Sequence, residues 1–105
     1  MEIIKLPKHF KGKGEVKNFD FEQVKSGVNA YLYQVSKGQS KWYEVFKKTY
    51  APICIDFDKR IYSENQKKEV YPKAKLFGVI AWCLDSKKSA IELFNKIEKK
   101  QNERI

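Results

Sequence analysis

Aromatic and β-branched residues are concentrated on either side of a short polar loop between residues 29 and 50, NAYLYQVSKGQSKWYEVFKKTY. Residues 30–36 and 41–50 are rich in aromatic and β-branched side chains, a composition typical of half-buried strands. The polar residues 37–40 lie between them and include Gly38, which can adopt the positive φ that a tight reversal needs. The pattern therefore predicts a β-hairpin, and the rest of the chain is interpreted around it.

The two faces of this hairpin both carry large apolar groups, because successive side chains of a strand point to opposite sides. On the second strand, Tyr43 and Val45 share one face, while Trp42, Phe46 and Tyr50 share the other. We expect one face to meet a helix. The other is either a second packing layer of core aromatics or a partly exposed binding surface, and the pattern leaves both interpretations open.

Two further segments have strand-like alternation. Residues 15–25 place Phe19 and Phe21 on one face, and residues 53–58 alternate apolar side chains with Cys54 and two aspartates. Residues 58–68, DKRIYSENQKK, are polar and charged, and we expect them to form the most mobile loop, with residues 69–71 briefly rejoining the sheet.

The most apolar run is LFGVIAWCL at residues 76–84, which favours a strand covered on both faces, with a buried helical turn as the alternative. Asp85 or Ser86 is a candidate N-cap for a following helix. The helix is indicated by an apolar stripe at helical spacing, formed by Ala90, Ile91, Phe94 and Ile97.

The predicted fold class is α+β: a mostly antiparallel meander sheet of four to five strands, with one C-terminal amphipathic helix packed on one face. Residues 1–14 are predicted to form a basic N-terminal arm, and residues 15–105 a single domain. One helix cannot cover both faces of such a sheet. The second face is then partly open or covered by the arm, a partner, or a second copy of the chain in a homodimer.

The charge balance points to an anionic partner. The chain of 105 residues carries 22 basic and 13 acidic residues, a net charge of +9. Such a surface attracts nucleic acid, an anionic membrane or an acidic protein, although part of the excess can simply maintain solubility. The excess is almost entirely Lys, which suits phosphate backbones better than bidentate readout of bases.

The predicted binding residues are lysines of the N-terminal arm, lysines and interleaved aromatic residues of the second hairpin strand, and two basic residues of the charged loop. They are Lys5, Lys8, Lys11, Lys13, Lys41, Trp42, Tyr43, Phe46, Lys47, Lys48, Lys59 and Arg60.

No catalytic residue, metal site or cofactor is predicted. His9 is the only histidine, so Ser-His-Asp and Cys-His arrangements and a zinc site have a poor set of residues. Asp56 with residues 85–87 loosely resembles the acidic-acidic-Lys set of nucleases, but Asp85 and Ser86 are better explained as a helix cap. Cys54 and Cys83 lie in apolar runs and are expected to be buried and reduced, although the sequence alone does not exclude a disulfide.

Several segments together resemble small proteins of bacteriophages and bacterial mobile elements. They are FKGKGEV at residues 10–16, AYLYQV at 30–35, YEVF at 43–46, and YP followed by FGxxAW at 71–82. The similarity covers most of the chain and brings no activity or site residues. It implies a host bacterial cytoplasm, in keeping with the absence of an apolar leader or membrane span. We therefore expect a non-enzymatic protein that binds nucleic acid, or alternatively a phage inhibitor, such as an anti-CRISPR protein, that binds an acidic host protein.

Overall fold

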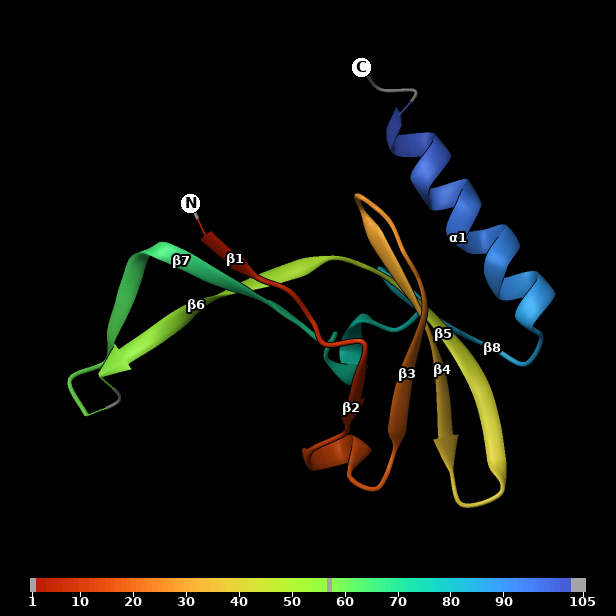
Figure 1. Ribbon diagram of the computed structural model, residues 1–105, viewed down its shortest axis with the longest axis horizontal. Coiled ribbons are helices and arrows are strands. Elements are labelled where there is room, and N and C mark those ends of the chain that lie inside the picture. The colour runs from red at the N-terminus through yellow and green to blue at the C-terminus, as the bar shows by residue number, and fades with distance from the viewer. Residues whose placement is uncertain (1, 57, 103–105) are drawn as a thin grey trace. The chain divides into compact units, whose positions relative to one another are not determined.

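The structure is a computed structural model that describes residues 2–56 and 58–102, so Phe57 of the predicted strand 53–58 lies outside the described residues. The fold class is α+β, as predicted, with one C-terminal helix (Figure 1). The elements follow in the order β1 (Glu2–Ile4), β2 (His9–Lys11), η1 (Gly14–Val16), β3 (Asp20–Ser26), β4 (Ala30–Lys37), β5 (Ser40–Lys47), β6 (Thr49–Asp56), β7 (Ile61–Val70), η2 (Ala74–Leu76), β8 (Ala81–Leu84) and α1 (Lys87–Asn102).

The chain divides into two compact units. Unit 1 contains Met1–Leu6 and Lys48–Tyr71, and unit 2 contains Pro7–Lys47 and Pro72–Ile105. The division differs from the predicted arm and single domain. Strand β1 belongs to unit 1, and β2 belongs to unit 2, so the segment predicted as one arm contributes a strand to each of two sheets.

Unit 2 is built on a five-stranded antiparallel sheet with the strand order β2-β3-β4-β5-β8. The predicted hairpin forms its centre: β4 pairs with β5 from Ala30↔Lys47 to Lys37↔Ser40. Gly38 closes the turn with φ +60°, a conformation that glycine adopts without steric cost. A register irregularity between Gln23 and Lys25 interrupts the pairing of β3 with β4.

Helix α1 lies against one face of this sheet (Figure 1). The predicted apolar stripe makes the contact. Phe94 and Ile97 are buried in a cluster with Leu32 and Val45, and Tyr43 and Trp82 pack against its margin. The helix begins after Ser86, whose Oγ accepts the N–H of Ser89 at 3.4 Å, as the N-cap prediction required. Alternation along β4 and β5 is therefore what brings the apolar face under the helix.

The opposite face of the sheet is an aromatic layer. The rings of Phe10 and Phe21 stack with centroids 4.6 Å apart, and those of Tyr33 and Phe46 stack at 5.7 Å. The hydroxyl of the fully buried Tyr33 donates to the carbonyl of Pro7 at 2.7 Å and accepts from Gln23 Nε2 at 3.1 Å, so its polar end is satisfied. For most of these aromatics, the core interpretation is therefore the right one.

The apolar run at residues 76–84 was predicted as a strand covered on both faces, and this was wrong. Only Ala81–Leu84 is a strand, and it lies at the edge of the sheet, beside β5. The preceding residues form η2 and a turn in which Gly78 has φ +93°, and Val79 is 63 % exposed. The positive φ at Gly78 ends the extended conformation before the apolar run can be used as one strand.

Unit 1 is a second, three-stranded sheet with the order β1-β7-β6. Strand β1 pairs in parallel with β7, and β6 pairs with β7 in an antiparallel hairpin. The prediction of a mobile loop at residues 58–68 was therefore wrong, because β7 begins at Ile61. Its residues have no single apolar face that would reveal a strand. Its backbone pairs with β6 on one side and, at Gln66–Lys68, with β1 on the other.

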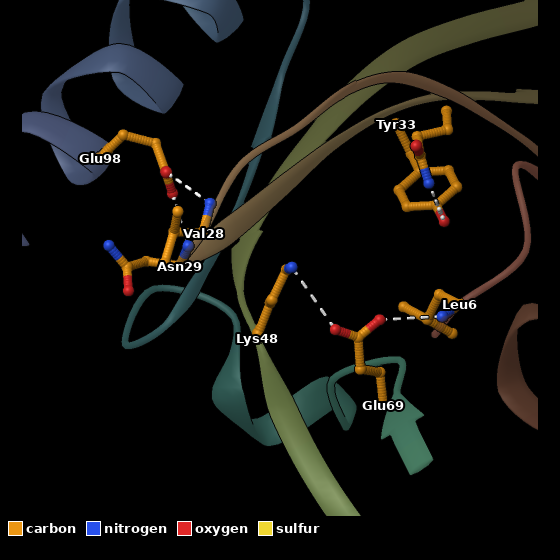
Figure 2. A network of polar contacts seen from close by, with 8 residues as sticks. Leu6, Val28, Asn29, Tyr33, Lys48, Glu69 and Glu98 are labelled. Atoms are coloured by element: carbon orange, nitrogen blue, oxygen red, sulfur yellow. Dashed lines mark hydrogen bonds and ion pairs between the residues drawn. The ribbon is translucent and has the colours of Figure 1, made fainter. Parts of the chain in front are cut away.

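Within unit 1, one acidic residue connects the N-terminal segment, the residue before β6, and β7. Glu69, on β7, is buried, and its Oε1 accepts the backbone N–H of Leu6 at 2.9 Å (Figure 2). Its Oε2 lies 3.5 Å from Nζ of Lys48, which precedes β6. A buried carboxylate needs such donors, so this network fixes where the N-terminal segment meets the hairpin.

Candidate nucleic-acid interface

Five exposed lysines of unit 2 lie at one end of the five-stranded sheet. Two connections meet there: residues 12–19, which join β2 to β3 through η1, and the turn between β4 and β5 (Figure 1). The register places Lys11 opposite Asp20, Asp20 opposite Ser36, and Ser36 opposite Lys41, so four strands end in one row. The N–H of Gly12 donates to the carbonyl of Phe19 at 2.9 Å and closes the first connection.

We call this end of the sheet the tip surface. It consists of five exposed lysines and two half-buried aromatic residues: Lys11, Lys13, Lys17, Lys37, Lys41, Phe19 and Trp42. Lys11 and Lys41 stand on the helix-covered face of the sheet, and Lys37 and Trp42 stand on the opposite face. The lysines thus surround the end of the sheet instead of lying on one side of it.

The aromatic pair of the tip surface has a defined geometry. The rings of Phe19 and Trp42 meet edge to face, with centroids 5.1 Å apart. The Nζ of Lys37 lies 5.5 Å from the centre of the Phe19 ring, within cation–π distance. Trp42 Nε1 donates to Oε2 of Glu44 at 2.9 Å, which holds the indole in place. The tip surface therefore combines positive charge with an oriented aromatic edge.

Acidic residues at the tip do not balance this charge. Glu15 is exposed in η1, and Asp20 lies with Oδ1 2.7 Å from Nε2 of His9. The tip thus has five lysines and two carboxylates, and the carboxylate of Asp20 is already paired with His9. An excess of this kind raises the local concentration of anionic ligands.

The structure separates the remaining predicted site residues of unit 2 from the tip. Tyr43 stands on the helix-covered face, where it packs against the helix cluster, and Phe46 has no exposed surface. Lys47 ends β5 opposite Ala30, about 20 Å along the strand from Lys41. Lys8 lies next to β3, where its carbonyl accepts the N–H of Gln23 at 2.7 Å.

Four predicted site residues belong to unit 1. Lys48 is paired with the buried Glu69, whereas Lys5, Lys59 and Arg60 are exposed. Lys59 and Arg60 form the turn between β6 and β7, where the N–H of Lys59 donates to Oδ1 of Asp56 at 3.2 Å. From the predicted set, the tip surface therefore keeps Lys11, Lys13, Lys41 and Trp42.

Sequence reasoning missed three members of the tip surface, namely Lys17, Phe19 and Lys37. The signal for Lys37 was present, because a reversal at Gly38 and Gln39 places Lys37 and Lys41 at the same end of the hairpin. Phe19 was assigned to a strand, but it precedes β3 and closes a turn at Asn18, which has φ +75°. Lys17 is placed by the same turn.

The surroundings of Cys83 raise the pKa of its thiol. Burial, followed by the negative charge and the hydrogen bond of Glu44, raises the pKa of this thiol to about 11. Its Sγ lies 3.8 Å from Oε2 of Glu44. A thiol with this pKa stays protonated at neutral pH and is a poor nucleophile. Both cysteines are free, as expected, but the prediction that their residues are buried was wrong, since both are exposed.

Within residues 2–56 and 58–102, no three His, Cys, Asp or Glu side chains gather as a metal-binding group. The described part of the chain also contains no helix long and apolar enough to cross a membrane. Comparison of the chain with protein-family models, with curated proteins and with solved structures gave no match.

Proposed function

We propose that this chain is a non-enzymatic binding protein that holds nucleic acid, preferentially single-stranded, at the tip surface. The observation that carries the proposal is that five exposed lysines lie at the same end of the sheet as the oriented Phe19–Trp42 pair. Lysines neutralise phosphates without reading sequence, and an aromatic edge provides a surface for unstacked bases. Following the resemblance to phage and mobile-element proteins, we place this activity in the cytoplasm of a bacterial host.

The test is a fluorescence-anisotropy titration with labelled single-stranded DNA and RNA and with duplex DNA, each at several salt concentrations. If all five lysines contact phosphates of a single strand, the logarithm of the binding constant should fall with the logarithm of salt with a slope of about −3.5. Lys37→Gln combined with Lys41→Gln should reduce the slope to about −2 and leave sequence preference nearly unchanged.

The matched control removes the same charge elsewhere in unit 2. Lys96→Gln with Lys99→Gln changes two exposed lysines of α1 and should leave the slope close to that of the unchanged chain. Equal effects of the two double variants would mean that overall charge, not the tip surface, attracts the ligand. The absence of binding to any nucleic acid at low salt would reject the proposal.

A second candidate function is that of a phage inhibitor that binds an acidic host protein. The same five lysines support it, because an ammonium group pairs with a carboxylate as well as with a phosphate. Capture from bacterial lysate, with and without nuclease treatment, separates the two. A complex with one acidic protein that survives nuclease and high salt supports the inhibitor.

A further inference from the structure

The helix-covered face of the five-stranded sheet is apolar where α1 packs on it and polar at the end near the tip surface. The apolar part includes Ala30, Leu32 and Val45. Toward the tip, the register sets polar side chains side by side on four strands. One row across the sheet consists of Lys11, Asp20, Ser36 and Lys41, and the next row consists of His9, Glu22, Gln34 and Tyr43. We call these two rows the open polar face.

The side chains of the open polar face are accessible. Four of the eight are exposed, and the other four are half-buried. In contrast, Phe21, Tyr33 and Val35, which stand on the opposite face of the same strands, have no exposed surface. A molecule held at the tip surface can therefore form hydrogen bonds with the open polar face, whereas these three side chains are closed to it.

Charge is unevenly distributed over the open polar face. Lys11 and Lys41 lie at the two ends of the first row and belong to the tip surface, whereas Asp20 and Glu22 lie on β3, between β2 and β4. Lysines attract phosphates, and carboxylates repel them. A single strand at the tip should therefore place its phosphates on the lysines and turn its bases toward the carboxylates.

The two carboxylates differ in how far they are already engaged. Asp20 Oδ1 lies 2.7 Å from Nε2 of His9. Glu22 is exposed, and it stands between His9 and Gln34 in the second row. An ionised carboxylate accepts hydrogen bonds through both of its oxygens and donates none. On this face, Glu22 is therefore the group best placed to receive two donors from one base.

Guanine is the base that matches this arrangement. Its Watson–Crick edge carries two adjacent donors, N1–H and the 2-amino group, and then the acceptor O6, whereas adenine, cytosine and thymine each have one donor group on that edge. Side chains read unstacked bases along this edge. The Glu22 carboxylate can accept both donors, and the side-chain amide of Gln34, opposite Glu22 in the register, can donate to O6.

We propose that the open polar face makes this protein prefer single strands that contain guanine, and that Glu22 determines the preference. The inference rests on the proposed binding at the tip surface and adds selection to it. Contacts to phosphates position a strand, and contacts to base edges specify it. The lysines thus supply affinity, and Glu22 distinguishes one base from another.

The first experiment is an anisotropy titration of the full chain with labelled oligothymidine strands that differ only at one central base. The strand with guanine should bind about tenfold more tightly than the strand with thymine, because one good bidentate contact discriminates by roughly this factor. Hypoxanthine lacks the 2-amino group, so a strand that carries it should lose most of the advantage. Equal affinity for the guanine and thymine strands would overturn this inference and leave the proposed function in place, whereas no binding of any strand would remove both.

Glu22→Gln separates recognition from charge. The variant loses a negative charge, so the thymine strand should bind more tightly than before. The new amide offers one acceptor group instead of two, so the preference for guanine should fall to about twofold or less. The matched control, Glu15→Gln, removes another exposed carboxylate of the tip and should tighten binding of both strands alike. A preference that survives in Glu22→Gln, or is lost equally in Glu15→Gln, would contradict the role of Glu22.

Discussion

The indole Nε1 of Trp42 donates a hydrogen bond of 2.9 Å to Oε2 of Glu44, two residues further along β5. Both side chains stand on the aromatic face of the sheet, and Glu44 is almost completely buried. Trp42 therefore has two roles that can be separated. Its N–H supports a buried carboxylate, while its ring belongs to the tip surface.

Trp42→Phe should lower stability more than affinity. The substitution keeps an aromatic ring but removes one donor from Glu44, and a lost hydrogen bond to a buried charged group costs about 1–3 kcal/mol. Urea denaturation should show this loss, whereas the affinity for single-stranded DNA should change by no more than a few fold.

Trp42→Ala removes the ring as well and should weaken binding by about 1–3 kcal/mol at conditions where the variant is folded. If the alanine variant binds as tightly as the unchanged chain, Trp42 is only a structural residue. The variant Trp82→Phe leaves Trp42 as the only tryptophan, so quenching of its fluorescence by DNA would report contact at the tip directly.

Phe94→Ala should cost about 3–5 kcal/mol, because Phe94 is buried among Leu32, Val45 and its helix neighbours. Chemical denaturation monitored by circular dichroism measures the change. Ile91→Ala is the control on the same helix, since Ile91 is only partly buried and should cost clearly less. A loss well under 1 kcal/mol at Phe94 would mean that α1 does not depend on this contact.

Glu98 should act as a clamp between α1 and the turn that joins β3 to β4. Its two carboxylate oxygens accept the N–H groups of Val28 at 2.8 Å and Asn29 at 2.9 Å (Figure 2). Charge-assisted bonds of this kind are worth about 1–3 kcal/mol each when partly shielded from water. Glu98→Ala should therefore reduce stability and speed hydrogen exchange at both amides, and Glu92→Ala, on the exposed side of α1, should do neither.

Gly27 offers a second test of the same clamp. A Cβ added at Gly27 would collide with the Glu98 carboxylate, so Gly27→Ala should displace it. The losses in the double variant Gly27→Ala/Glu98→Ala should then be smaller than the sum of the single losses, because both changes break one interaction. Additive losses would show that the two residues act independently.

The sequence contained enough information for the part of the fold in which local pattern and burial agree. The stripe of Phe94 and Ile97 has one buried face at helical spacing, and the strands around Gly38 bury aromatic and β-branched residues on both faces, so pattern and composition could be translated into packing. The edge position of β8 could not be predicted in the same way, because the apolar composition of residues 76–84 does not indicate the turn at Gly78.

The second sheet was hidden for a different reason. Strand β7 is stabilised by pairing with β1, whose sequence is far away, and its side chains are mostly polar. Long-range pairing of this kind leaves no periodic signal. The tip surface could likewise be predicted only in part. Lys11 and Lys41 are seen to lie in the same row across the sheet only when the register of β2, β3, β4 and β5 is known.

Cys83 should react slowly with thiol reagents, and Cys54 should react quickly. Both residues are exposed, but burial of the sulfur and the carboxylate of Glu44 raise the pKa of the Cys83 thiol from 9.0 to about 11. The thiolate is the reacting species, so on Cys54→Ser the alkylation rate should keep rising with pH until about pH 11. Stopped-flow or mass-spectrometric labelling over this range measures it.

The raised pKa of Cys83 also predicts how the stability of the protein depends on pH, and the contribution of Glu44 to it can be tested. The unfolded chain loses the thiol proton near its ordinary pKa, and the folded chain loses it later, so the contribution of Cys83 to stability is complete below pH 9 and declines as pH rises toward 11. Glu44→Gln removes the charge but leaves the burial, so the pKa should fall and yet stay above its ordinary value. A Cys83 that reacts as fast as Cys54 at neutral pH, or a pKa unchanged in Glu44→Gln, would contradict this account of the Glu44–Cys83 contact.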